Sequence, residues 1–246
     1  MINITSTDNK RIKDVCRLRE RRWRSDCKKY ITEGYRNVKD SLPYLTGAEI
    51  YVSQSSFEKY SKEFDIDVIC ADNVFAKISE TENSQGILCV SDIPQDKFND
   101  EKDCVYLDGV SDPGNAGTIL RTCLATGFDN VIFADGVDCY NPKVVRSAMS
   151  AVCKLNISSG KADMLFELKK KGYKLICADM SGKNLFDCDF GDCKKCLIIG
   201  SEARGVGKDI LLNSDEVVSL PMNEIESLNA AVCASVMMYE LKYNKK

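Results

Sequence analysis

The stretch "DPGNAGTILRT", residues 112–122, lies between an apolar run that ends at Leu107 and a second run that starts at Val131. Its proline and two glycines predict a tight turn in which the backbone can approach a ligand closely. We expect the following helix to begin near Ala116 or Gly117. The nucleotide-loop spacings G-x-x-x-x-G-K-[ST] and G-x-G-x-x-G are absent here, so the loop is built for another ligand.

Around this loop, from residue 104 onward, short apolar runs alternate with helical stretches. The runs are CVYL (104–107), NVIF (130–133), KLNI (154–157), KLIC (174–177), CLIIG (196–200) and EVVSL (216–220). A helix is expected near 143–151, and a long one at the C-terminal end. Such alternation predicts an α/β fold with a parallel sheet that is covered on both faces.

The sequence before residue 104 predicts a smaller α/β domain. Residues 7–29 are expected to form one helix, and short apolar runs follow at IYVS (50–53), DVIC (67–70) and GILCV (86–90). The polar segment PQDKFNDEKD (94–103) has no apolar periodicity, which is typical of a linker. We therefore place two domains at 1–97 and 102–246.

Positive charge is concentrated at the N-terminal end of the chain. Residues 1–40 hold twelve lysines and arginines against six acidic residues, although the whole chain has a net charge of −3. In the expected helix, Ile12, Val15 and Trp23 form the apolar stripe, which leaves the arginines mostly outside. This pattern suits phosphate binding by one domain, and a solvated basic helix face is the alternative.

The chain contains no histidine. This excludes Ser-His-Asp, Cys-His and H-E-x-x-H chemistry, because each of these needs an imidazole. Catalysis must therefore use carboxylates, lysine, arginine, hydroxyls, thiols or a reactive cofactor.

Thirteen cysteines occur without an export signal or an apolar stretch long enough to span a membrane. Scattered thiols of this kind are typical of the reducing cytoplasm. The spacing C-x4-C-x2-C at Cys188, Cys193 and Cys196 resembles a zinc or iron–sulfur ligand run, but it has no evident fourth ligand. We therefore expect no metal, with Cys196 opening a strand.

Three segments follow the apolar runs, where parallel sheets place their ligands: 107–122, 197–207 and 219–232. If the first helix begins between Asn115 and Arg121, both side chains lie at its ligand-facing end. The arginine suits a phosphate or carboxylate and the asparagine a hydroxyl. The alternatives are a surface salt bridge and a turn-forming asparagine.

The other two segments add polar groups to the same edge. Glu202 points a carboxylate toward it, or is an exposed turn residue. Ser227 or Asn229 leads into a helix that is apolar all round, which predicts burial on several sides. The free N–H groups at that helix start need partners, which a small molecule or a plain Ser227 cap can supply.

Together the three segments resemble the three signature motifs of the SpoU/TrmH family of 2'-O-ribose RNA methyltransferases, in the SPOUT superfamily. The resemblance lies in DGVSDPGNAGTILRTCLATGFDNVIF (108–133), YNPKVVRSAMSAV (140–152), IIGSEARG (198–205) and LPM…ESLNAAVCASVMMYE (220–240). The N-terminal segments ITSTDNKRIKDV…RRWR…YITEGYRNVKDSL and ISETENSQGILCV are similar to the ribosomal-protein-like substrate-binding domain of many members.

The resemblance implies methyl transfer from S-adenosylmethionine to a ribose 2'-hydroxyl in structured RNA, by a parallel-sheet domain with a deep trefoil knot. Ribosomal RNA is implied more than transfer RNA, because of the accessory domain. A catalytically silent RNA-binding dimer of the same fold and a cysteine-ligated metal protein are the other hypotheses. Members dimerise through the knotted domain, and the Arg121 of one copy completes the site of the other.

The resemblance also implies roles for individual residues. Asn115 orients the 2'-hydroxyl. Arg121 is the family's key catalytic residue, and we favour it as an electrostatic positioner because arginine stays protonated in proteins. The remaining catalytic candidates are Glu202, Ser227 and Asn229. The cofactor-binding candidates are Ile199, Gly200, Ser201, Leu220, Met222 and Leu228. The RNA-binding candidates are Lys10, Arg11, Lys13, Arg17, Arg21, Arg24 and Arg36.

The chain departs from the family pattern between LPM and ESLN. Only residues 223–225 lie there, one fewer than in the commonest pattern and without glycine. This loop is expected to wrap the cofactor. Its shorter length therefore changes the backbone contacts that the resemblance implies between the loop and the cofactor.

Overall fold

The computed structural model describes residues 1–225 and 227–244, which divide into two compact units. The first unit comprises Met1–Gln95 and Tyr140–Lys154, and the second comprises Asp96–Cys139 and Leu155–Lys246. Within the described residues, no helix has the length and apolar character that crossing a membrane requires.

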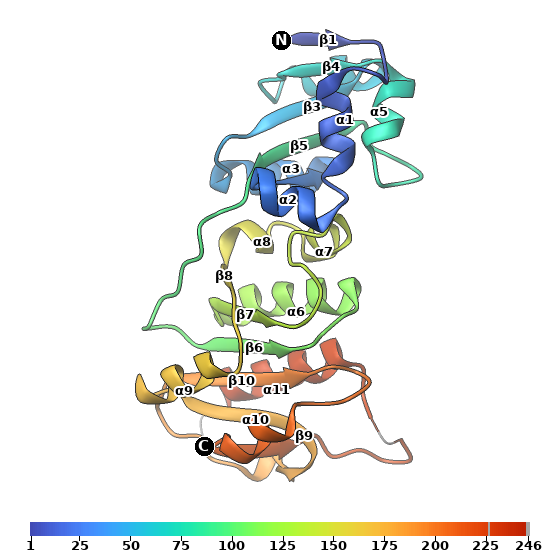
Figure 1. Cartoon of the computed structure of the whole chain (residues 1–246). Coiled ribbons are helices and arrows are strands. Elements are labelled where there is room, and N and C mark those ends of the chain that lie inside the picture. Colours follow the sequence, from blue (N-terminus) through green and yellow to red (C-terminus); the bar gives the residue numbers. More distant parts are fainter. Residues whose placement is uncertain (226, 245–246) are drawn as a thin grey trace. The chain divides into compact units, whose positions relative to one another are not determined.

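The first unit is built on a five-stranded mixed sheet in the order β1-β4-β3-β5-β2 (Figure 1). Its strands are β1 (Ile2–Ile4), β2 (Lys29–Glu33), β3 (Glu49–Ser53), β4 (Val68–Cys70) and β5 (Ile87–Asp92). Its helices are α1 (Lys10–Arg17), α2 (Arg21–Cys27), α3 (Tyr35–Ser41), α4 (Phe57–Tyr60), α5 (Asp72–Ile78), α7 (Pro142–Ala148) and α8 (Ala151–Lys154).

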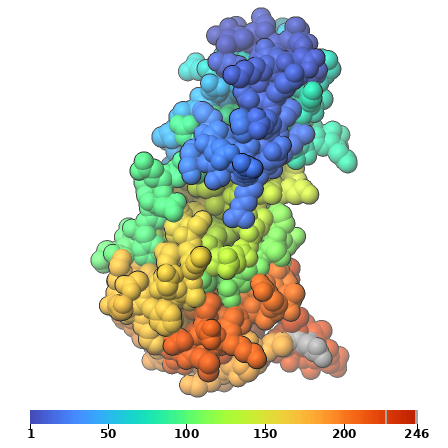
Figure 2. All heavy atoms as spheres, viewed as in Figure 1, coloured from blue at the N-terminus to red at the C-terminus, as the bar shows by residue number. Residues whose placement is uncertain are grey.

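Alternating strand residues give this unit two cores, one on each face of its sheet. On one face, Tyr51 and Leu88 pack with apolar residues of α1 and α5. On the other face, Val52 and Cys89 pack with residues of α3 and α4. Figure 2 shows that the α1–α2 segment (dark blue) reaches the surface of this unit.

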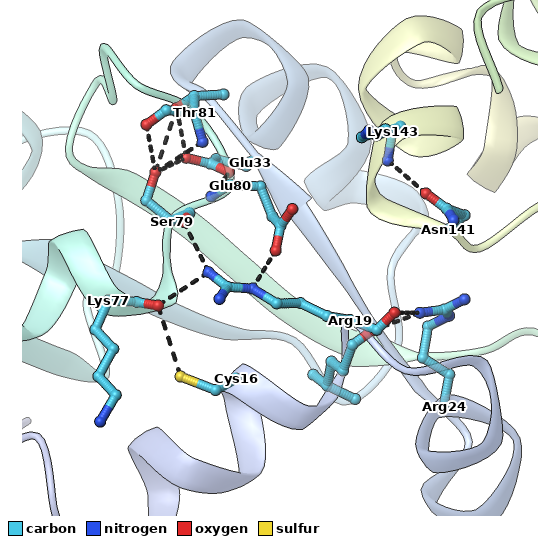
Figure 3. A network of polar contacts seen from close by, with 11 residues as sticks. Cys16, Arg19, Arg24, Glu33, Lys77, Ser79, Glu80, Thr81, Asn141 and Lys143 are labelled. Carbon is cyan, nitrogen blue, oxygen red and sulfur yellow. Dashed lines mark hydrogen bonds and ion pairs between the residues drawn. The ribbon is translucent and has the colours of Figure 1, made fainter.

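The single helix expected at 7–29 is wrong, because the structure has α1 and α2 with a break between them. Asn9 caps α1, because its side-chain oxygen accepts the Arg11 backbone N–H at 2.9 Å. At the break, the Arg24 guanidinium donates to the carbonyl groups of Leu18 (2.7 Å) and Arg19 (2.8 Å) (Figure 3). These bonds satisfy carbonyl groups that the end of α1 leaves free.

The segment 140–154 packs with the first unit, although its sequence neighbours belong to the second. Asn37 of α3 donates to the Val145 carbonyl at 3.4 Å, and the rings of Tyr30 and Tyr140 lie 5.0 Å apart. This placement differs from the boundary expected from sequence, which keeps 102–246 together. The linker composition at 94–103 indicates where the chain first passes from the first unit to the second. Nothing comparable in the sequence indicates that residues 140–154 belong to the first unit again.

The second unit is built on a six-stranded, all-parallel sheet in the order β11-β9-β10-β6-β7-β8. The strands are β6 (Cys104–Asp108), β7 (Asn130–Ala134), β8 (Asn156–Ser159), β9 (Lys174–Asn184), β10 (Lys195–Gly200) and β11 (Glu216–Ser219). The helices are α6 (Pro113–Thr126), α9 (Asp163–Lys170), α10 (Lys208–Asn213) and α11 (Ala230–Tyr243).

Helices cover this sheet in two layers. Apolar residues of α9 and α10 pack with Tyr106 and Ile198 on one face. Helices α6 and α11 pack against each other and against β7 and β10. The expected α/β fold with a parallel sheet is therefore confirmed, and the knot that the resemblance implies stays a prediction.

Candidate active site

A cavity of about 600 Å³ lies in the second unit, beside a bulge in β9 and at the carboxyl ends of β10 and β11. Parallel strands present their carboxyl ends at one edge of the sheet, which is where ligands bind in such folds. The cavity is lined by three groups of residues, from 178–180, 199–205 and 218–237. Two of the three segments singled out from the sequence thus meet at one place.

The segment after β10 forms a closed turn at the cavity. The backbone groups of Ser201 and Gly205 bond to each other in both directions, at 3.2 and 2.9 Å. A Cβ atom at Gly200 would lie 2.2 Å from the Gly205 carbonyl carbon, so only glycine fits. Glu202 sits in this turn and lines the cavity.

Helix α6 begins at Pro113, three to four residues before the expected start. Asp112 caps it by accepting the Asn115 backbone N–H at 2.7 Å, and proline occupies the first helical position. Proline is favoured there because the first turn leaves its N–H without a partner anyway. Asn115 therefore lies in the first turn of the helix.

Helix α11 begins at Ala230, and Asn229 caps it. The Asn229 Oδ1 accepts the backbone N–H groups of Ala231 (2.9 Å) and Val232 (3.2 Å). The cap is thus Asn229, and Ser227 lines the cavity without capping the helix. This frees the Ser227 hydroxyl for a ligand.

A chain of hydrogen bonds connects the three segments. The Asn229 Nδ2 donates to Asn115 Oδ1 at 2.9 Å, and the Asn115 Nδ2 donates to Glu202 Oε1 at 2.6 Å. The charge-assisted bond to the carboxylate is the stronger of the two. The amide of Asn115 is consequently held between two residues that line the cavity.

All six candidate cofactor residues line this cavity, as do three of the five catalytic candidates. The six are Ile199, Gly200, Ser201, Leu220, Met222 and Leu228, and the three are Glu202, Ser227 and Asn229. Asn115 joins them through its hydrogen bonds. Glu226, in the third motif, lies outside the described residues.

Arg121 lies apart from this group in its own chain. It is exposed on α6, does not line the cavity and has no hydrogen bond or ion pair to the described residues. Because the helix starts before Asn115, six residues separate the two side chains by about 9 Å along the axis and about 240° around it. The expectation that both lie at the same end of α6 is wrong.

Sequence reasoning missed several residues that line the cavity. Asp179 and Met180 follow the apolar run KLIC and lie within β9, in a bulge between its two pairings with β11. Arg204, Cys233 and Met237 line it as well. Burial raises the pKa of the Cys233 thiol, which keeps this group neutral and a poor nucleophile.

Six of the seven candidate RNA-binding residues are exposed on the first unit: Lys10, Arg11, Lys13, Arg17, Arg21 and Arg36. Arg11 pairs with Glu49 at 3.4 Å, and Arg17 lies over the Trp23 ring at 3.4 Å. Arg24 is only 2% exposed and bonds to the backbone, so its expected contact with RNA is corrected to a structural role.

The cysteines of the C-x4-C-x2-C run lie in different surroundings. Cys196 is buried in the sheet core beside Cys104, whereas Cys188 and Cys193 donate to the carbonyl groups of Asn184 and Phe190. Among the described residues, no group of three or more histidine, cysteine or acidic side chains is placed to hold a metal.

Two family models match the chain. The SpoU rRNA Methylase family matches residues 103–239, and the MRM3-like substrate binding domain matches residues 9–89. Among curated proteins, the 23S rRNA (guanosine(2553)-2'-O)-methyltransferase RlmP of Bacillus subtilis is 29% identical over 98% of this chain and 100% of its own length.

Solved structures show the same fold. The AdoMet-bound rRNA methyltransferase from Sinorhizobium meliloti has a TM-score of 0.84 at 22% identity and covers 97% of both chains. The SpoU methyltransferase AviRb from Streptomyces viridochromogenes, in complex with AdoMet, has a TM-score of 0.83 at 24% identity, over 94% of this chain and 96% of its own.

Proposed function

We propose, because the chain belongs to the SpoU rRNA Methylase family, that it transfers a methyl group from S-adenosylmethionine to a ribose 2'-hydroxyl of ribosomal RNA. The observation that carries this proposal is the hydrogen-bond chain from Asn229 through Asn115 to Glu202 at the edge of the cavity. The relative RlmP, a 23S rRNA 2'-O-methyltransferase, matches along nearly the whole chain.

The size of the cavity and the residues that line it suit S-adenosylmethionine. Its volume of about 600 Å³ falls in the usual range for small-molecule sites. Glu202 and Asp179 offer carboxylates for the positive charge, and Leu228, Met222 and Met237 offer apolar surface for the adenine. When bound, this cofactor supplies an electrophilic methyl group.

The residues at the cavity edge orient the attacking hydroxyl. Asn115 is held on both sides, so its amide is fixed in place before RNA arrives. Preorganised polar groups lower the barrier because they need no rearrangement during reaction. The Ser227 hydroxyl adds a further donor and acceptor at this edge.

Arg121 acts in the site of a second copy of the chain. In its own chain it does not line the cavity. It lies on α6, which packs against α11, and α11 carries an exposed apolar stripe made of Val232, Val236, Tyr239 and Tyr243. The stripe recurs at helical spacing, and Val232 and Tyr239 are 49% and 51% exposed. The sequence predicts that this helix is buried on several sides, and a homodimer through the α6–α11 layer would cover the exposed stripe.

The first unit supplies the RNA-binding surface and the second the chemistry. Residues 9–89 match a substrate-binding domain, and six of the basic candidates are exposed there. The thirteen cysteines are all free, which fits a protein of the cytoplasm.

Replacing Arg121 tests the proposal. We expect Arg121→Ala to bind S-adenosylmethionine with wild-type affinity in calorimetry, while the rate of methyl transfer to ribosomal RNA falls by about 1,000-fold, as for loss of one preorganised charge contact. Near-normal turnover in this variant would remove Arg121 from the mechanism. Wild-type protein that binds RNA but not S-adenosylmethionine would instead indicate a catalytically silent RNA-binding dimer.

A further inference from the structure

A second cavity, of about 490 Å³, lies entirely within the first unit. It is formed by the end of β2 and the start of α3, by the loop 81–85, and by residues of the segment 140–154. Arg36 and Arg146 both line it, together with Tyr35, Asn83 and Met149. Two cationic side chains from distant parts of the sequence thus face one hollow.

The acidic group of this cavity is already engaged by the protein. The Glu33 carboxylate accepts hydrogen bonds from Ser79, Thr81 and the Glu80 backbone N–H (Figure 3). It accepts a further one from Ser84. It therefore has little capacity left to bind either arginine. Gln85 is engaged too, because its Oε1 accepts the Tyr35 backbone N–H at 2.7 Å.

The arginines have no such partners. Arg36, Arg146 and Asn83 are exposed and form no side-chain hydrogen bond or ion pair with the residues that the structure describes. Two guanidinium groups around one hollow repel each other unless an anion lies between them. Guanidinium groups bind phosphate oxygens through two parallel hydrogen bonds.

The wall of the cavity also includes a strained residue. Met149 adopts φ 55° and ψ −144°, a conformation that residues other than glycine rarely adopt. The helical pattern of α7 ends at this residue, with Ala148 as its last position. The unusual backbone places a methionine at the cavity wall, where its flexible thioether can pack against a planar ring.

We propose that this cavity binds one unpaired nucleotide of the RNA substrate, with its phosphate on Arg36 and Arg146 and its base between Tyr35, Asn83 and Met149. The inference rests on the proposed RNA methyltransferase function. An unpaired nucleotide fits because proteins recognise RNA sequence in loops whose bases can leave the stack. A paired base stays within its helix and cannot enter a cavity.

This site joins two regions that the family models keep apart. Arg36 lies in the range matched by the substrate-binding domain, whereas Arg146 lies in the range matched by the methylase family. Asn37 connects them by donating to the Val145 carbonyl. The segment 140–154 therefore contributes to substrate binding in the first unit.

The test compares two RNA probes: a hairpin with an unpaired loop and a fully paired duplex with the same number of phosphates. The variants are Arg36→Ala, Arg146→Ala and the double variant. The matched control is Arg22→Ala, since Arg22 is exposed on α2 outside the cavity. Fluorescence anisotropy over a range of salt concentrations gives affinities and salt slopes.

We expect the double variant to bind the hairpin roughly tenfold more weakly, with the salt slope reduced by about 0.7 for each arginine removed. Its affinity for the duplex, and both affinities of Arg22→Ala, should change much less. An equal loss for hairpin and duplex, or an equal loss in Arg22→Ala, would overturn the inference, because either result indicates charge attraction alone.

Two further readouts separate this inference from the proposed function. In the double variant, calorimetry with S-adenosylmethionine should be unchanged, and methyl transfer should show a raised KM for RNA with an unchanged kcat. If wild-type protein transfers no methyl group, the proposed function fails. The comparison of hairpin and duplex binding still shows whether the cavity binds an unpaired nucleotide. Arg146→Lys keeps the positive charge but lacks the two parallel N–H donors of the guanidinium group. It should therefore bind the hairpin more tightly than Arg146→Ala but more weakly than wild type.

Discussion

At the scale of single residues, the Asn115 amide determines how the cavity edge is held together. It donates to Glu202 at 2.6 Å and accepts from Asn229 at 2.9 Å, so it needs both a donor and an acceptor. No other side chain of the same shape offers both. Aspartate has the shape of asparagine but presents only acceptors when ionised.

We therefore expect Asn115→Asp to lower the rate of methyl transfer by roughly 100-fold at neutral pH, the cost typical of a small misplacement of reacting groups. Two carboxylates would face each other, and the repulsion would raise the pKa of the pair. Activity should partly recover as the pH falls, because a shared proton restores a hydrogen bond. Single-turnover rates against pH measure this effect.

The matched control is Asn213→Asp. This substitution makes the same chemical change at an exposed residue, at the end of α10 and outside the cavity. It should keep wild-type rates at every pH. A pH profile of Asn115→Asp that parallels the wild-type profile would contradict the assigned role of the Asn115–Glu202 bond.

At the scale of elements, the strands of the second unit follow directly from the sequence. Apolar runs such as 104–107 and 130–133 are buried on both faces of a parallel sheet, and continuous apolar runs predict such strands. The sequence does not predict β1 or β2. β1 has only three residues, and β2 begins at Lys29, the last residue of the helix expected at 7–29.

For the site, the family resemblance names the six cofactor candidates, and their role in binding stays a prediction. All six line the cavity, at or after the carboxyl ends of β10 and β11. The Asp112-Pro113 pair could have indicated the true start of α6, because a capping residue followed by proline is typical of a helix start. The burial of Arg24 could not be predicted, since it depends on carbonyl groups that only the break between α1 and α2 exposes.

Pairing of β9 with β11 depends in part on Asp215. Its carboxylate pairs with Lys169 at 2.7 Å and accepts the Leu175 backbone N–H at 2.9 Å. Burial alone would raise the pKa of Asp215, but the bonds from Lys169 and Leu175 outweigh it and hold the pKa below its ordinary value. The stabilisation is therefore present above the ordinary carboxyl pKa and is lost as the pH falls through the lowered one.

We expect Asp215→Asn to lower the free energy of unfolding by about 1 kcal/mol at neutral pH. The difference from wild type should vanish in acid, where the native carboxylate is protonated and loses the same interaction. Urea unfolding over a pH series measures this. Glu167→Gln, which removes an exposed pair with Lys170, is the control and should have little effect. A pH-independent difference would show that the charge is not responsible.

At the scale of the whole molecule, the proposed homodimer predicts that assembly and activity are lost together. Val236→Glu places a charge in the exposed apolar stripe of α11. We expect this variant to sediment as a monomer and to bind S-adenosylmethionine, but to transfer methyl groups at least 100-fold more slowly, because no second copy supplies Arg121.

Leu212→Glu is the control for that experiment. Leu212 is 83% exposed on α10, so the substitution adds the same charge on the opposite helical layer. It should leave both the sedimentation and the activity unchanged. A wild-type chain that is monomeric and active, or a Val236→Glu variant that stays dimeric, would contradict the proposed assembly.

The return of the segment 140–154 to the first unit limits how this protein can be divided or recombined. A fragment ending at residue 97 would lack α7, whose Val144, Val145 and Ala148 are buried, and would expose apolar surface on its neighbours. Exchange of the RNA-recognising module with a homologue therefore requires two crossover points in the gene, and a single cut in the linker would produce a chimera with mismatched packing.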